Sequence, residues 1–351
     1  MIATAVTLAC VVFAPPQEPP PDLSEPLARL AVPADRASGA EQILACDPEA
    51  SVPALVACIV EAPPAHAWQA MRVLRKVVAA CDRSRDRMLE GHAGRLAGAA
   101  ADASSPALSR QVRVLAVGAL GRADKQTLAA LQTIMDTDDS DAMTLASCVA
   151  LAQLGKPAAR ALAKSIDDDR AATAKATMAI ASLGAMGADA GAAKAKLRSI
   201  LNDREGSDAW LLAYSTRNAM NRIAGEKLTA RLWEKRRKET TRRSFRFPES
   251  RLDFSALTSM PELLVFDVAK AVGVKVRGDP IMPGSWALPT DFEGRSVDVG
   301  DGCRQLLAHI GDQVAAITDE VRDDRIESDE QWTRRLQPVE RTWDLMRAVF
   351  R

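Results

Sequence analysis

Val117-Gly118-Ala119-Leu120-Gly121 is a pattern that returns as Leu151-Ala152-Gln153-Leu154-Gly155 and as Ile180-Ala181-Ser182-Leu183-Gly184. Each copy closes an alanine-rich helical run, and a second run that ends in acidic residues follows it. A weaker copy, Ala219-Met220-Asn221-Arg222-Ile223, lies where the next unit should fall. Steps of roughly 30 to 37 residues are typical of stacked helix pairs. The stretch from Arg110 to Gly225 therefore predicts an α-solenoid.

Helical periodicity extends this array toward the N-terminus, so we expect the solenoid to span residues 35–225. Its outer units are degenerate, as terminal repeats often are. Gly155 suits a left-handed helix C-cap, and Pro157 suits a first helical turn. The expected helices cover residues 35–46, 52–62, 67–81, 84–101, 109–121, 124–135, 141–154, 157–166, 172–183, 190–201 and 207–224.

The Leu-Gly closures, the acidic turns and the repeat length resemble HEAT repeats of the kind also seen in phycobilisome lyases. The resemblance covers about half of the chain. It implies a right-handed stack of helix pairs whose extended face holds partner proteins. A lyase-type enzyme, or an accessory of one, is an alternative that the same resemblance raises.

The N-terminus predicts export. Residues 1–14 are an apolar run that ends in small residues, and a Pro-rich segment follows it, as in secretory signals. We expect residues 15–34 to form a disordered tail. Lipidation at Cys10 and an N-terminal helix packed on the solenoid are alternatives. Export would place the mature chain in the periplasm or envelope, and the cytoplasm is the other possibility.

The six cysteines are not spaced as CxxC, which excludes a zinc ribbon on spacing. Cys148 lies on the apolar side of a repeat helix and is expected to be buried. Cys46 and Cys81 each end a predicted helix, with one helix between them, so both ends should lie at the same edge. In an oxidising compartment these two could form a disulfide. Two free thiols are the alternative.

A change of composition after Gly225 predicts a basic helical connector over residues 226–250. Such a run can contact phosphates or anionic headgroups, and a solvated hinge between domains is the alternative. The basic run 235–243 within it has no aromatic residues for stacking on bases, which disfavours nucleic acid. The residues that could contact an anionic partner are Lys235, Arg236, Arg237, Lys238, Arg242 and Arg243.

Residues 251–351 are predicted to form a small α+β domain. We expect helices at 260–272, 302–310 and 339–350, and strands at 274–277, 286–292, 313–318 and 325–328. The run Val268-Ala269-Lys270-Ala271-Val272-Gly273-Val274-Lys275-Val276, followed by a helix with Leu306-Leu307, is similar to the short N-terminal domain of secretins and TonB-dependent receptors. That resemblance implies an envelope module that contacts other proteins.

The sequence predicts no catalytic, cofactor or metal site. The three histidines, His66, His92 and His309, form no HxxxH or HExxH pair. The acidic run 136–141 lacks the glycine and the bidentate Glu of a calcium loop, so we interpret it as helix capping. Equal numbers of acidic and basic residues give no overall attraction to nucleic acid or membranes.

These observations together predict a non-catalytic protein-binding scaffold of the cell envelope. The protein partner is not identified by the sequence. The alternatives are the lyase-type enzyme and a cytosolic regulator that binds nucleic acid or anionic membranes through the basic connector. No segment after residue 14 is long and apolar enough to span a membrane.

Overall fold

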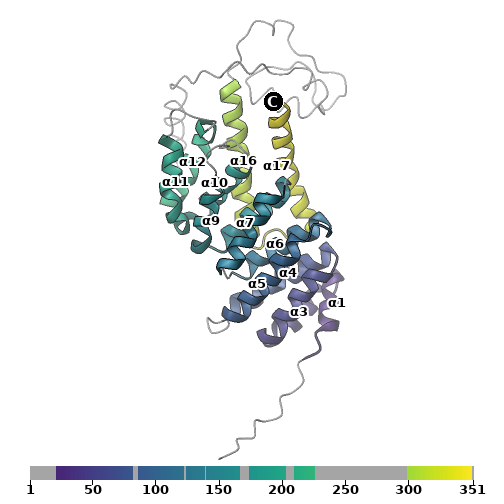
Figure 1. Cartoon of the computed structure of the whole chain (residues 1–351). Coiled ribbons are helices and arrows are strands. Elements are labelled where there is room, and N and C mark those ends of the chain that lie inside the picture. Colours follow the sequence, from purple (N-terminus) through teal and green to yellow (C-terminus); the bar gives the residue numbers. More distant parts are fainter. Residues whose placement is uncertain are drawn as a thin grey trace, which may run out of the picture.

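The computed structural model describes residues 21–81, 86–121, 124–138, 140–166, 174–202, 209–225 and 299–349. These residues are mainly helical, and no strand occurs among them, so the mainly α prediction is confirmed (Figure 1). No helix within these ranges is long and apolar enough to cross a bilayer. The predicted signal segment, the basic connector and about half of the predicted α+β domain lie outside the described residues.

Two layers of helices form the body, an arrangement consistent with an α-solenoid. In the inner layer each helix contacts the next, and each packs on a partner in the outer layer. The inner helices are α4 (Pro64–Ala80), α6 (Ala107–Ala119), α8 (Asp141–Gln153), α10 (Ala174–Met186) and α12 (Ala209–Ala224). The outer elements are α3 (Pro48–Glu61), α5 (Asp86–Ala101), α7 (Lys125–Thr137), η2 (Lys156–Ala158) with α9 (Ala159–Lys164), and η4 (Gly187–Ala193) with α11 (Lys194–Asn202).

The repeated Leu-Gly closures end two of the inner helices in the predicted way. Gly121 and Gly155 follow α6 and α8 with φ angles of 65° and 71°, the left-handed region that glycine enters without strain. The third closure differs. Gly184 lies inside α10, where an added Cβ would be 3.0 Å from the Cα of Ala219. Its lack of a side chain lets α10 and α12 approach closely, and α10 ends instead before Gly187.

The disordered tail predicted for residues 15–34 is wrong over part of its length. Ser24–Ala31 form α1, which packs against α2 (Arg36–Leu44) and α4. Leu23 and Leu30 are buried, so this segment has an apolar stripe that packs on the body. The prediction of disorder rested on the high proline content and overlooked this stripe. Pro26 is tolerated because the first turn of a helix needs no backbone N–H at that position. Residues 1–20 lie outside the described residues.

The α+β prediction is wrong for residues 299–349. These residues form two long helices, α16 (Val299–Arg322) and α17 (Asp329–Val349). The strand predicted at 313–318 lies inside α16, and the strand predicted at 325–328 is the connection between the two helices. The last helix begins at Asp329 and not at Val339. Residues 251–298 lie outside the part of the chain that the structure describes.

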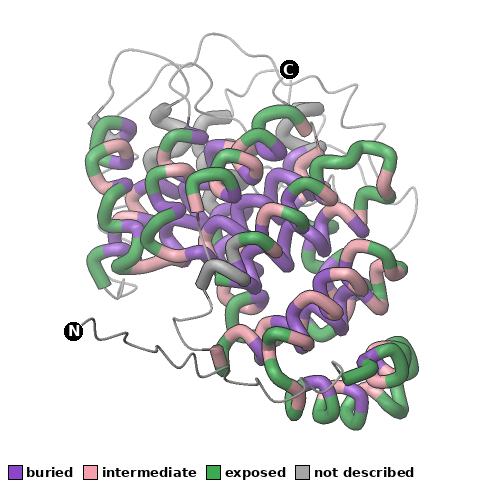
Figure 2. The backbone as a smooth tube through the Cα atoms, turned by 60° about the horizontal axis from the view of Figure 1, so that its bottom comes forward, coloured by how far each residue is buried: buried purple, intermediate pink, exposed green. Residues whose placement is uncertain are grey.

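The α16–α17 hairpin forms a third layer on the inner helices. α16 contacts α8, α10 and α12, and α17 contacts α4 and α8 (Figure 1). Its buried apolar residues join the core of the repeats, and buried positions continue through the stack (Figure 2). The larger apolar residues that the hairpin buries are Ile310, Val314, Ile317, Val321, Ile326, Trp332, Leu336, Val339 and Trp343. The inner face of the stack is therefore covered along this length by the chain itself.

Candidate functional site

The connection between α16 and α17 is held on α4 by two arginines. Asp324 accepts hydrogen bonds from Arg72 through both carboxylate oxygens, each at 3.1 Å, and from Nη1 of Arg75 at 3.2 Å. All three side chains are less than one quarter exposed. Asp324 has a φ of 57°, a left-handed conformation unusual for a residue with a side chain. Burial lowers the pKa of Arg75, while the Asp324 charge opposes this effect.

Two tryptophans extend this anchor into the core. Trp68 donates from Nε1 to the carbonyl oxygen of Ile326 at 3.3 Å, and Trp332 donates to Oε1 of Gln111 at 2.9 Å. The centroids of the two indole rings lie 6.0 Å apart at a tilt of 35°. Both rings are buried with their polar nitrogens satisfied, which is the arrangement a buried tryptophan requires. The hairpin is thus fixed in register against α4 and α6.

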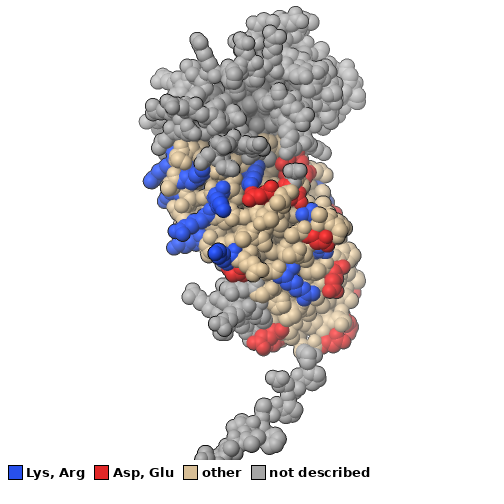
Figure 3. Space-filling model, in the orientation of Figure 1, with Lys and Arg blue, Asp and Glu red and all other residues tan. Residues whose placement is uncertain are grey.

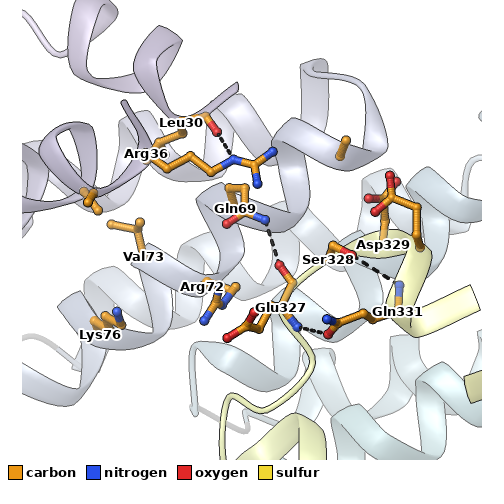
Figure 4. A pocket seen from close by; sticks show the side chains of 14 residues that line it. Leu30, Arg36, Gln69, Arg72, Val73, Lys76, Glu327, Ser328, Asp329 and Gln331 are labelled. Carbon is orange, nitrogen blue, oxygen red and sulfur yellow. Dashed lines mark hydrogen bonds between the residues drawn. The ribbon is translucent and has the colours of Figure 1, made fainter. Parts of the chain in front are cut away.

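A cleft of about 540 Å³ lies beside this anchor. One wall comes from α1, α2 and α4, and the other comes from the loop after α16 and the first turn of α17 (Figure 4). Gln69 bridges the walls at one edge, because its Nε2 donates to the carbonyl oxygen of Glu327 at 2.8 Å. The size and the position between two separate parts of the chain are typical of a ligand site.

The two walls of the cleft carry opposite charges. Arg36 and Lys76 lie on the α2–α4 wall, and Glu327, Asp329 and Glu330 lie on the hairpin wall (Figure 4). Arg36 uses only Nε internally, to donate to the carbonyl oxygen of Leu30 at 3.1 Å. Its terminal nitrogens and the exposed Lys76 ammonium have no hydrogen-bonding partner among the described residues.

Asp329 is the buried member of the acidic wall. Burial raises the pKa of its carboxyl group, and the neighbouring Glu330 carboxylate adds to the rise. Ser328 accepts a hydrogen bond from the backbone N–H of Gln331 at 3.2 Å, which caps the start of α17. A carboxyl group whose charge is disfavoured in this way gains most from an added cation. The acidic wall therefore favours a basic group of a ligand.

The cysteines proposed for a disulfide carry free thiols in the structure. Cys46 donates from Sγ to the carbonyl oxygen of Gln42, and Cys81 does the same to Val77, each at 3.3 Å. Both lie at helix ends, as predicted, and their pairing stays a prediction. The possible anionic-partner residues of the connector lie outside the described residues, and so does the side chain of Cys303.

One cysteine and one histidine meet, but not in a nucleophilic arrangement. Nε2 of His66 lies 2.7 Å from the carbonyl oxygen of Leu27, so this nitrogen must carry the proton and donate it. The same nitrogen is 3.5 Å from Sγ of Cys58 and cannot also accept the thiol proton. Burial, with a smaller effect of Glu61, raises the pKa of Cys58 to about 11. This pair is structural.

The acidic turns of the repeats act as helix caps and ion pairs. Asp124 accepts from the backbone N–H of Thr127 at 2.7 Å at the start of α7. Within the run 136–141, Asp136 pairs with Lys175 and Asp138 pairs with Arg110. No group of three metal-ligating side chains occurs within the described ranges. The N-cap of α8 is Ser140, so the capping interpretation of this run is wrong for Asp136 and Asp138, and Asp141 lies in the first turn of α8.

Sequence reasoning missed the cleft because its two walls come from segments about 250 residues apart. Arg72 and Arg75 are polar positions of the helix predicted at 67–81, and Asp324 lies between the strands predicted at 313–318 and 325–328. The only local signal was an arginine pair three residues apart on one helix face. Comparisons with protein-family models, curated proteins and solved structures find no match to this chain.

Proposed function

We propose that this protein is a non-catalytic scaffold that binds a partner protein in the cleft between α4 and the start of α17. The opposite charge of the two walls carries the proposal. Arg36 and Lys76 offer donors to a carboxylate, while Glu327 and Glu330 offer acceptors to a basic side chain. A protein segment with acidic and basic residues close together fits this arrangement.

The cleft is well suited to binding because its walls are already fixed. The anchor of Asp324 on Arg72 and Arg75 holds the hairpin wall in place without a ligand. A preorganised site binds with a smaller loss of conformational entropy than a mobile one. Solenoids often hold their partners on the inner face, but here the hairpin covers that face. The cleft beside the hairpin is therefore a better candidate for the binding site than the inner face.

We further propose that the stacked pairs are HEAT-like and form a right-handed solenoid, on the support of the repeat length and the Leu-Gly closures. An envelope location stays a prediction from residues 1–14. The lyase-type enzyme and the regulator acting through residues 226–250 also stay predictions from the sequence.

Site-specific photocross-linking tests the cleft. A benzophenone amino acid at Ala37, which lines the cleft, should give protein adducts in cells. The same amino acid at Ala192, on the exposed surface of η4, is the matched control and should give few. Lys76→Glu should reduce the Ala37 adducts several-fold by removing the basic wall's exposed charge.

Lys125→Glu is the control for this charge reversal, because Lys125 is exposed on α7 and lies outside the cleft. It should leave the Ala37 adducts unchanged. Equal adducts at Ala37 and Ala192, or adducts at Ala37 that Lys76→Glu does not alter, would contradict binding in the cleft.

A further inference from the structure

Five cations form two rows on the outer layer at the C-terminal end of the repeats. Lys156, Arg160 and Lys164 are spaced four residues apart along η2 and α9, so they share one helix face. Lys194 and Arg198 are spaced in the same way on α11. α9 contacts η4, which leads directly into α11, so the rows are neighbours. We call these five residues the basic strip, and Figure 3 shows Lys and Arg gathering on this side.

The basic strip has an energetic cost in the isolated protein. Like charges four residues apart on a helix repel each other and destabilise it. None of the five residues has an ion pair with a described side chain, and Lys156, Arg160, Lys164 and Arg198 are exposed. Over residues 156–166 and 187–202 there are six basic residues and one acidic residue, Asp189. Asp167, Asp168 and Asp169 lie outside the described residues.

The opposite end of the stack carries the opposite charge. Residues 21–63, which include α1 to α3, contain seven acidic and two basic residues. The two large hydrophobic side chains that are exposed in the described part of the chain also lie here, Val32 at 45% and Leu44 at 40%. Apolar side chains with a charged rim are typical of a protein interface. We call this surface, with Asp35, Glu41, Asp47 and Glu49 exposed on it, the acidic end.

We propose that the chain associates head to tail with a second copy of itself, the acidic end of one copy docking on the basic strip of the next. Charge complementarity supports this occupant: the chain is neutral overall, yet formal charges of five units and opposite sign lie at the two ends of its repeats. Contact of the two relieves the repulsion within each row and covers Val32 and Leu44. This contact uses two different surfaces, so it can extend into open chains and not only dimers.

Sedimentation velocity of the full chain tests the proposal. Self-association should be strong at an ionic strength of about 0.01 M and lost at about 1 M, since the Debye length falls from about 30 Å to about 3 Å. Arg160→Glu/Lys164→Glu and Glu41→Lys/Glu49→Lys should each be monomeric, with association weakened at least tenfold. Lys125→Glu/Arg334→Glu changes two exposed cations elsewhere and should associate like the wild type.

Mixing the two variants gives the decisive readout. Each keeps one intact surface, so the mixture should form 1:1 dimers and nothing larger. A protein that combines all four substitutions keeps net formal charges of only +1 on the basic strip and −1 on the acidic end, and it should stay monomeric. A wild-type chain that stays monomeric at low salt overturns the proposal. So does association that the reversals leave unchanged, or a basic strip that binds anionic lipid vesicles while the protein in solution stays monomeric.

Discussion

Gly118 and Gly94 are both helical glycines, but their surroundings differ. A Cβ added to Gly118 in α6 would lie 2.8 Å from the Cα of Ala150 in α8, while a Cβ at Gly94 in α5 would meet nothing within 4 Å. The inner helices α6 and α8 therefore pack with their backbones in close contact at Gly118. At Gly94 no close contact requires a glycine, and the residue only lowers the helix propensity of α5 relative to alanine.

The two alanine variants should consequently change stability in opposite directions. We expect Gly118→Ala to destabilise the protein by about 1–3 kcal/mol, because the inner layer must spread apart. Gly94→Ala should stabilise it by up to about 1 kcal/mol through helix propensity. Urea unfolding followed by circular dichroism measures both. A Gly118→Ala protein as stable as the Gly94→Ala protein would refute the close packing.

At this scale the sequence predicts local roles and fails for distant ones. The caps by Asp124 and the left-handed glycines at 121 and 155 could be predicted because both partners lie within a few residues. Gly184 shares the same local pattern and acts differently, because the neighbour that decides its role, Ala219, lies on another helix. The partners of Asp324 were beyond reach for the same reason.

At the scale of whole elements, one carboxylate, that of Asp324, holds the α16–α17 hairpin in position. Asp324→Asn keeps the size of the side chain and its tolerance of the left-handed conformation, but removes the charge that Arg72 and Arg75 share. Two partly buried guanidinium groups then lack a counter-charge. We expect a loss of about 2–3 kcal/mol in the free energy of unfolding, as for hydrogen bonds to charged groups.

Asp323→Asn is the matched control in the same loop. Asp323 pairs with Arg322 and Arg325, but all three side chains are about half exposed, so the loss should stay below about 1 kcal/mol. Chemical denaturation compares the two variants under one set of conditions. If the two losses are equal, Asp324 does not anchor the hairpin.

The hairpin also explains why a strand was predicted at 313–318, inside α16. Residues 313–318 alternate well enough to fit a strand when they are taken alone. A longer window shows Ile310, Val314, Ile317 and Val321, spaced by four, three and four residues, and this spacing belongs to a helix. α17 repeats it with Trp332, Leu336, Val339 and Trp343. The helical pattern was present in the sequence over this longer window.

Titration of a buried thiol affects the stability of the whole molecule at high pH. Burial raises the pKa of Cys148 in α8 to about 12, against an opposing effect of the Lys175 charge. The folded state therefore binds this proton more tightly than the unfolded state, whose thiol has a pKa near 9.0. The resulting stability is complete below pH 9 and is lost as the pH rises toward 12.

Cys148→Ala should make the fall in unfolding free energy above pH 9 shallower by about 1.4 kcal/mol per pH unit. Ser147→Ala removes a neighbouring buried polar group that does not titrate in this range, and it should keep the wild-type slope. Urea midpoints between pH 8 and 11, measured for both variants, give the two slopes. Identical slopes would show that Cys148 is not protected in the folded state.

For the molecule as a whole, the stacked helices were predictable and their covering was not. Repeats produce local, recurring patterns, so the helices from residue 35 to 225 could be placed within a few residues. The third layer depends on contacts of α16 and α17 with the inner helices, and the cleft depends on contacts between α4 and the loop after α16. No pattern within one window of sequence specifies which distant helix a second amphipathic helix will cover.

The late position of the hairpin in the chain has a consequence for synthesis. All the repeats leave the ribosome before residues 299–349. The apolar surface of α8 and α10 that α16 covers in the folded chain is therefore exposed to solvent until this last segment has been made. Simple repeat arrays fold as each unit joins its neighbour. Here completion needs a contact between residues more than 250 positions apart, which delays burial and leaves the nascent stack open to aggregation or to a chaperone.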